Sequence, residues 1–203
     1  MQARLISLLL GYAFGCFITA ELVTRRLVGK RPAEIGSGNP GMANIMAQLG
    51  FRAGALVLAG DVLKTAAACV LAAVLFPAAR GIAPLYAGLG AVLGHDFPFW
   101  NRFRGGKGVA STCMALFVYD PLWGLLADIA GMLAVFSTGW LPLGGVLIPL
   151  CYFVFALCLR GAEPAALAAV LTLLAAQRHW PGLLRVLRGQ EKPVARLFAR
   201  KKS

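Results

Sequence analysis

The sequence is divided into apolar blocks that are long enough to cross a lipid bilayer. The clearest blocks cover residues 5–24, 53–76, 82–100 and 142–159. Hydrophobic residues make up 59% of the 203-residue chain and charged residues 14%, whereas a soluble domain is about half apolar and about a quarter charged. A helical span needs about 20 apolar residues, so these blocks predict an all-α membrane protein with several spans.

Basic residues between the apolar blocks predict which segments face the cytoplasm. Sixteen of the 20 Lys and Arg residues lie in segments 25–52, 101–108 and the tail from residue 178. Because Lys and Arg are enriched in cytoplasmic loops, we expect all three segments on that side, with the N-terminus outside and the C-terminus cytoplasmic. The first apolar block lacks a small-residue cleavage site, so we interpret it as a retained span and not as a secretory signal.

The number of spans depends on the region between residues 108 and 178. This topology requires an even number of crossings there, but three apolar blocks are visible. Asp120-Pro121 interrupts the first block, and a proline at the first helical position is typical of a helix start. Splitting the block into 109–119 and 121–137 predicts about seven short transmembrane helices. We expect one polytopic helix bundle, with residues 1–203 forming a single domain.

The formal net charge of +12 predicts anionic partners. The charges lie between hydrophobic blocks, so membrane lipid headgroups and phosphorylated substrates fit this pattern better than nucleic acid. The five cysteines lie in apolar stretches and form no Cys-x-x-Cys pair, which argues against a disulfide framework or a metal site. Neither a cofactor nor an obligatory protein partner is indicated.

The first candidate segment is a glycine-rich loop at residues 36–44, directly before an apolar stretch. Its glycines permit positive φ and close backbone approach, and successive backbone N–H groups before a helix can bind an anion. An ordinary connecting loop is the alternative interpretation. The candidate residues are Gly36, Ser37, Gly38, Asn39, Gly41 and Asn44.

The second candidate segment places a lysine within a glycine turn at the start of another apolar stretch. Such a lysine can bind a phosphate, and a cytoplasmic topology charge is the alternative for Lys107. The segment is not a Walker A motif, because no Ser or Thr follows the lysine. His95 is expected at the membrane edge, either as a satisfied interfacial side chain or as a proton- or phosphate-binding group. The candidate residues are His95, Arg104, Gly105, Gly106, Lys107 and Gly108.

The third candidate segment begins with Arg178-His179-Trp180 at the start of the basic tail and continues through Arg185 and Arg188 to Lys192. Helical spacing places His179, Gly182 and Val186 on one face. An amphipathic surface helix held by anionic lipid is the alternative interpretation. The chain has only two histidines, His95 and His179, and both are predicted at the cytoplasmic rim, which favours a functional role for each.

Two charged residues lie within a predicted span. Asp61 and Lys64 are three residues apart, on one face of the expected helix. Because charges inside a membrane are costly, we expect the two side chains to pair with each other, and a functional role is the alternative.

Together the three segments resemble the PlsY family of bacterial glycerol-3-phosphate acyltransferases. Family members carry the motifs GSGNxGxTN, GHxFPxFxxFKGGKGVAT and HRxNIxRLLxGTE. Here the segments read GSGNPGMAN (36–44), GHDFPFWNRFRGGKGVAS (94–111) and HWPGLLRVLRGQE (179–191). Their order and spacing agree across nearly the whole chain, and the middle stretch is highly specific.

The resemblance implies a seven-helix enzyme of the bacterial inner membrane with its active site on the cytoplasmic face. It implies transfer of an acyl group from acyl phosphate to the 1-hydroxyl of sn-glycerol 3-phosphate, which gives lysophosphatidate and inorganic phosphate without a metal. Ser37, Lys107 and His179 are the expected catalytic residues. Glu191 and the remaining candidate residues are expected to bind substrate.

Several positions depart from the family pattern. The family Thr of the first loop is Ala43, and a nearby phosphate-binding Arg is Ala47. A cytoplasmic Arg-Tyr-x-Ser stretch corresponds to residues 139–142, and the Asn that follows the terminal His is Gly182. The lost groups include donors and cations for phosphate. The alternative hypotheses are a divergent paralogue with a different acceptor and a non-catalytic membrane protein that binds lipids or anions.

Overall fold

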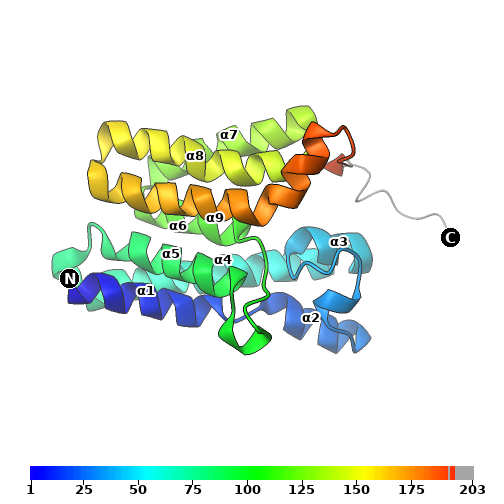
Figure 1. Ribbon diagram of the computed structural model, residues 1–203. Coiled ribbons are helices and arrows are strands. Elements are labelled where there is room, and N and C mark those ends of the chain that lie inside the picture. The colour runs from blue at the N-terminus through cyan, green and yellow to red at the C-terminus, as the bar shows by residue number, and fades with distance from the viewer. Residues whose placement is uncertain (192, 195–203) are drawn as a thin grey trace.

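The computed structural model describes residues 1–191 and 193–194, and every regular element in them is helical (Figure 1). The three short 3₁₀ turns are η1 (Pro32–Glu34), η2 (Pro77–Ala79) and η3 (Phe99–Asn101). The α-helices are α1 (Gln2–Gly15), α2 (Thr19–Val28), α3 (Met42–Leu49), α4 (Phe51–Leu75), α5 (Ala83–Asp96), α6 (Val109–Tyr119), α7 (Pro121–Thr138), α8 (Leu141–Leu159) and α9 (Ala162–Leu187). The prediction of an all-α protein is confirmed.

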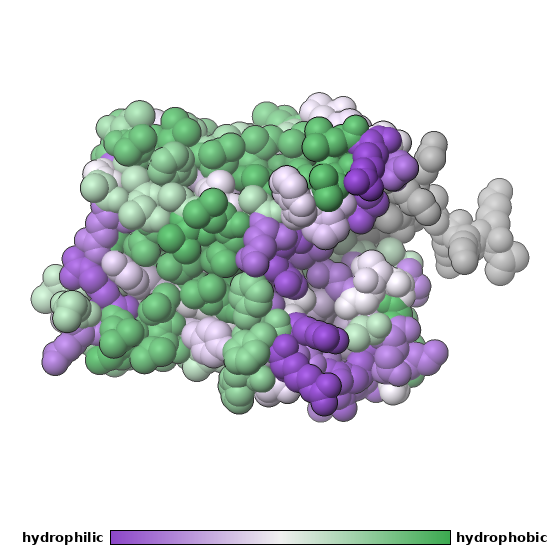
Figure 2. Space-filling model, viewed as in Figure 1, coloured by the Kyte–Doolittle hydropathy of each residue, from purple (hydrophilic) through white to green (hydrophobic). Residues whose placement is uncertain are grey.

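The outer surface of the bundle is suited to a bilayer. Four helical stretches are long and apolar enough to cross a membrane, namely Gln2–Val28, α4, α7 and α8. Large apolar side chains such as Leu63, Leu133 and Phe136 are exposed. Figure 2 shows apolar residues over the middle of the visible face and hydrophilic residues toward its ends. An apolar exterior around helices that satisfy their own backbone is what a bilayer requires, and the chain is a multi-pass membrane protein.

The helix boundaries confirm some predictions and correct others. α6 ends at Tyr119 and α7 begins at Pro121, as the Asp120-Pro121 pair predicts. The predicted span over residues 5–24 lies within the stretch Gln2–Val28, but its helix is interrupted between α1 and α2. α5 ends at Asp96, not at residue 100, and the chain turns at Pro98. α9 ends at Leu187 and so extends into the basic tail, which begins at residue 178.

Part of the basic tail cannot be placed in this fold. The predicted cytoplasmic C-terminus at Ser203 lies outside the described residues. The same holds for five of the basic residues on which the predicted topology rests, Lys192, Arg196, Arg200, Lys201 and Lys202.

α1 and α5 approach each other closely because glycines face the crossing from both helices. A Cβ at Gly11 or Gly15 of α1 would collide with the backbone of α5. A Cβ at Gly90 or Gly94 of α5 would collide with the backbone of α1. Small residues four positions apart allow such close approach of helices in membranes. This contact fixes the C-terminal end of α5, from which the second candidate segment begins.

A larger side chain at this crossing should destabilise the bundle. We expect Gly11→Val to lower the free energy of unfolding by about 1–3 kcal/mol, because the new side chain would meet the Ala87 carbonyl and force the helices apart. Thermal unfolding of the purified protein in detergent measures the change. Gly81→Ala is the matched control, since nothing lies within 4 Å of the Cβ that it would add. Equal unfolding midpoints for the two variants would contradict the crossing.

Candidate active site

The three candidate segments lie toward the same end of the bundle, opposite the N-terminus (Figure 1). Residues 36–41 lead into α3, residues 97–108 connect α5 to α6, and the third segment includes the C-terminal end of α9. The glycine–lysine turn, defined as residues 105–108, is the point where α5, α6 and α9 meet.

Backbone hydrogen bonds hold the glycine–lysine turn against the end of α5. The N–H of Gly105 donates to the Asp96 carbonyl at 3.0 Å, and the N–H of Gly106 donates to the His95 carbonyl at 2.9 Å. A Cβ at Gly105 would collide with the His95 carbonyl, and a Cβ at Gly106 would collide with the His95 ring. These two glycines therefore serve close packing, and their N–H groups are already engaged within the protein.

Arg178 of α9 holds the same turn from the other side. Its Nε donates to the Gly106 carbonyl at 2.8 Å, and its Nη2 donates to the carbonyls of Gly105 and Gly106 at 2.8 and 2.6 Å. The guanidinium also lies over the Phe97 ring, 5.2 Å from its centroid. A planar guanidinium fork suits two adjacent carbonyls. Arg178 begins the third candidate segment, but it was not among the predicted site residues.

Lys107 projects from the turn into a basic environment. Its side chain is half-buried, and burial lowers the pKa of the ammonium below its usual range. The nearby guanidinium groups of Arg185 and Arg178 lower that pKa further, while the carboxylate of Glu191 opposes them. Glu191 is itself paired with Arg185, whose Nε lies 2.6 Å from its Oε2. The excess of positive charge around Lys107 favours an anion such as a phosphate.

His179 is buried beside this basic group. Its residue is 3% exposed, and neither ring nitrogen has a hydrogen-bond partner among the described residues. The ring lies within electrostatic reach of Lys107 and Arg178. On its other side, α8 makes room for it with Gly145, where a Cβ would lie 2.6 Å from His179 Nε2. Buried polar groups are rarely left unpaired, so these nitrogens are suited to contact a ligand.

Asn44 shapes the first candidate loop. Its Oδ1 accepts a hydrogen bond from the Ser37 N–H at 2.9 Å, and its Nδ2 donates to the Asn39 carbonyl at 3.0 Å. Gly36 and Gly38 have positive φ values of 54° and 75°, which glycine adopts readily. The Asn44 amide is therefore engaged in holding the loop, and Ser37 is exposed.

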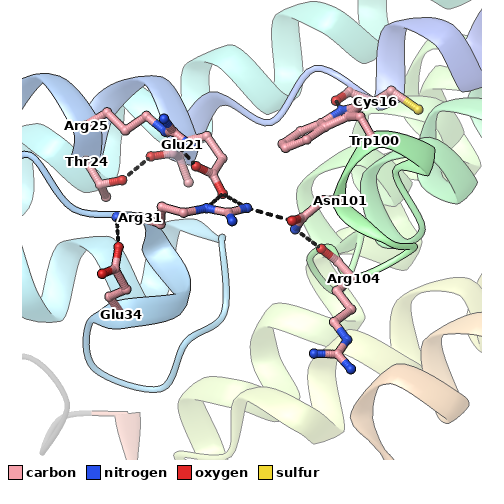
Figure 3. Close-up of polar contacts among 10 residues, drawn as sticks. Cys16, Glu21, Thr24, Arg25, Arg31, Glu34, Trp100, Asn101 and Arg104 are labelled. Atoms are coloured by element: carbon pink, nitrogen blue, oxygen red, sulfur yellow. Dashed lines mark hydrogen bonds and ion pairs between the residues drawn. The ribbon is translucent and has the colours of Figure 1, made fainter.

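A polar bridge ties the chain before this loop to the second segment. Figure 3 shows Arg31 between Glu21 and Asn101, with Nη2 donating to Glu21 Oε1 at 3.2 Å and to Asn101 Oδ1 at 2.6 Å. Asn101 in turn donates to the Arg104 carbonyl, while the Arg104 side chain is exposed. Within the described residues, no hydrogen bond connects Ser37 to Lys107 or His179.

Two of the positions that depart from the family pattern contact each other. A Cβ at Gly182 of α9 would lie 2.5 Å from Cγ of Pro142 on α8. The family residues at these places are an Asn and a Ser, and both are polar. This chain has instead a close apolar contact between α8 and α9, next to His179.

The two cavities of the described residues lie away from this site. Their volumes are about 490 and 350 Å³, and they are lined by residues that include Arg80, Tyr119 and Arg160. Among residues 1–191 and 193–194, no three His, Cys, Asp or Glu side chains form a group that could hold a metal ion. The residues gathered at the glycine–lysine turn are suited to bind an anion.

Comparisons with known proteins connect these segments to one family. The family described as Glycerol-3-phosphate acyltransferase matches residues 5–189. Glycerol-3-phosphate acyltransferase 1 of Lactobacillus acidophilus is 35% identical to the chain and aligns over 99% of it and 97% of the relative. Glycerol-3-phosphate acyltransferase of Clostridioides difficile is 33% identical over 94% of the chain and 95% of the relative.

A solved structure is similar over the same extent. The crystal structure of PlsY (YgiH), an integral membrane glycerol 3-phosphate acyltransferase, in its glycerol 3-phosphate form has a TM-score of 0.85 to this chain. The two are 26% identical, and the match covers 97% of this chain and 99% of that one. The likeness therefore extends through all three candidate segments and the helices that carry them.

The Arg178 contacts predict a measurable rigidity of the glycine–lysine turn. We expect Arg178→Ala to speed amide hydrogen exchange at Gly105 and Gly106, because the turn loses three hydrogen bonds from α9. Arg178→Lys should give an intermediate rate, since an ammonium lacks the planar fork. Exchange of peptides that cover residues 97–109, followed by mass spectrometry, measures this. Arg188→Ala, on an exposed arginine, is the control, and equal exchange in all variants would contradict the clamp.

Proposed function

The chain belongs to the glycerol-3-phosphate acyltransferase family, and from this premise we propose that its acyl donor is acyl phosphate. The reaction joins the acyl carbonyl to the 1-hydroxyl of glycerol 3-phosphate and breaks the bond between that carbonyl and phosphate. The products are lysophosphatidate and inorganic phosphate. Residues 1–203 form a single domain in this proposal, and membrane lipids surround it.

The observation that carries the proposal is the buried, unpaired imidazole of His179 next to a basic group. Its two nitrogens have no partner among the described residues, and Lys107 and Arg178 are the nearby cations. A reaction between two phosphate-bearing substrates needs cations for their charge and a group that can take the proton of the attacking hydroxyl. The end of α9 and the glycine–lysine turn provide both in one place.

Four residues have roles in this mechanism. Lys107 binds a substrate phosphate and stabilises the charge that develops as the phosphate leaves. His179, or the leaving phosphate itself, takes the proton from the 1-hydroxyl. Ser37, on the exposed loop before α3, is the third proposed catalytic residue. Arg178 positions the turn and does not need to touch substrate.

A second candidate function is transfer of the acyl group to a different acceptor. The contact between Gly182 and Pro142 favours it, since family positions that carry Asn and Ser are filled by an apolar contact here. Fewer donors then remain for the acceptor phosphate. An assay that offers glycerol 3-phosphate and other polyol phosphates as competing acceptors separates the two functions by their products.

The role of Lys107 gives the direct test. With acyl phosphate and labelled glycerol 3-phosphate, the purified protein should form lysophosphatidate. Lys107→Ala should lower kcat/KM by about 10- to 150-fold, because it removes a charge-assisted contact of roughly 1.5–3 kcal/mol. Lys107→Arg should recover only part of this, because a guanidinium fork does not replace a point charge in a tight turn.

Two controls complete the Lys107 experiment. Lys30→Ala removes an exposed lysine from the same predicted cytoplasmic side, so it should leave transfer unchanged. Because burial lowers the pKa of Lys107, wild-type kcat/KM should fall as the pH rises, at a lower pH than for an ordinary lysine. Lys107→Arg should remove this fall, since arginine stays charged. Normal insertion with unchanged transfer in Lys107→Ala would leave only a topological role for this lysine.

We further propose seven crossings of the bacterial inner membrane, with the active site on the cytoplasmic face. The clustered basic residues support this orientation. In intact cells, Gly81→Cys in the turn between α4 and α5 should react with a membrane-impermeant thiol reagent, and Ser203→Cys should not. The unsubstituted chain gives the background from its five native cysteines. Labelling of Ser203→Cys before cell lysis would overturn the proposed topology.

A further inference from the structure

A buried cluster of charged and polar side chains lies beneath the glycine–lysine turn. Asp61 and Lys64 of α4 form the expected pair, with Nζ 2.8 Å from Oδ1, and each side chain is 5% exposed. Lys64 Nζ also lies 3.0 Å from Nδ1 of His95 on α5. Thr19 of α2 donates to Asp61 Oδ1 at 3.3 Å. None of these contacts has a role in the mechanism described above.

Lys64 also satisfies the backbone where the first span is broken. Its ammonium donates to the Phe17 carbonyl at 2.7 Å and to the Gly15 carbonyl at 3.3 Å. A single cation thus links the end of α1, the carboxylate of Asp61 and the ring of His95. Intramembrane charges are costly and frequently mark functional sites, so the link to His95 is the informative part.

The contact with Lys64 determines which nitrogen of His95 carries the proton. An ammonium has only donors, and at 3.0 Å one of the three N–H groups of Lys64 can donate to His95 Nδ1, which then acts as the acceptor. A neutral imidazole that accepts at Nδ1 has its proton at Nε2. A proton on His95 Nδ1 is unfavourable, because it would face the Lys64 ammonium at 3.0 Å. The other acceptor near this nitrogen, Asp61 Oδ1, lies 3.6 Å away.

The protonated edge of His95 then faces the glycine–lysine turn. His95 Nε2 is the atom nearest to the position that a Cβ would take at Gly106. No hydrogen bond of this nitrogen is present among the described residues. The ring therefore forms the floor of the turn that carries Lys107, and its Nε2–H is available to an acceptor bound beside the turn.

We propose that Asp61 and Lys64 are positioning residues that hold His95 as its Nε2–H tautomer beneath the glycine–lysine turn, where it donates a hydrogen bond to a substrate oxygen. The identity of the substrate in this inference rests on the proposed function. The tautomer of His95 rests only on the contacts described above. Asp61 and Lys64 act through His95 and do not touch substrate themselves. A structural role confined to the break after α1 would not require the contact between Lys64 and His95.

The tautomer can be measured directly in the wild-type protein. With ¹⁵N-labelled histidine only two residues contribute signals, and His179→Ala assigns those of His95. Nitrogen NMR distinguishes a protonated ring nitrogen from a bare one. We expect a bare Nδ1 and a protonated Nε2 at neutral pH. A proton on Nδ1, or on both nitrogens, would overturn the inference without any variant at Asp61 or Lys64.

A double-mutant cycle tests whether Lys64 acts through His95. Lys64→Met and His95→Ala should each lower kcat/KM by about 10- to 150-fold, and the double variant should be no worse than the stronger single variant. In Lys64→Met, the His95 signals should show a mixture of tautomers. Additive losses in the cycle, or an unchanged tautomer in Lys64→Met, would reduce Lys64 to a structural residue.

The ion pair between the buried carboxylate of Asp120 and the exposed guanidinium of Arg160 provides the control. Arg160 donates to Asp120 at 2.6 and 3.1 Å, away from the glycine–lysine turn. Asp120→Asn should weaken the fold but leave the His95 signals unchanged, and its effect on transfer should add to that of His95→Ala. The nitrogen spectrum does not depend on turnover. If the wild-type protein shows the predicted tautomer but transfers no acyl group, the proposed function is rejected and the inference about the His95 tautomer stands.

Discussion

One buried ammonium holds together the parts of the bundle on which the candidate site depends. Lys64 donates to the backbone where α1 ends, pairs with Asp61 of its own helix and contacts His95 of α5. In a bilayer no water is available to the carbonyls that a helix break releases, so a side chain must satisfy them. The same side chain fixes the ring on which the glycine–lysine turn rests.

The turn is built from two sides, and this construction leaves few groups free for a ligand. The end of α5 engages the N–H groups of Gly105 and Gly106, and Arg178 engages their carbonyls. The side chains that remain to meet a substrate are the ammonium of Lys107, the ring of His179, which has no hydrogen-bond partner among the described residues, and the proposed Nε2–H of His95. Phosphate binding would therefore depend on side-chain charge more than on a nest of backbone N–H groups.

The sequence predicted those structural features that depend on residues close together in the chain. The start of α7 follows from Asp120-Pro121, and the pairing of Asp61 with Lys64 follows from their spacing on one helix face. Features that depend on distant residues were missed. The break after α1 is stabilised by Lys64, 47 residues away from Phe17, and the site role of Arg178 comes from a turn 72 residues earlier. That Ser37 lies at the same site as Lys107 and His179 stays a prediction.

Centrally, we propose that Lys107 and His179 form one substrate site at the C-terminal part of α9. A structure of the protein with bound glycerol 3-phosphate tests this most directly. We expect phosphate oxygens within hydrogen-bond distance of Lys107 Nζ, and the 1-hydroxyl of glycerol 3-phosphate beside a ring nitrogen of His179. Glycerol 3-phosphate bound elsewhere, with Lys107 and His179 free of it, would contradict the claim.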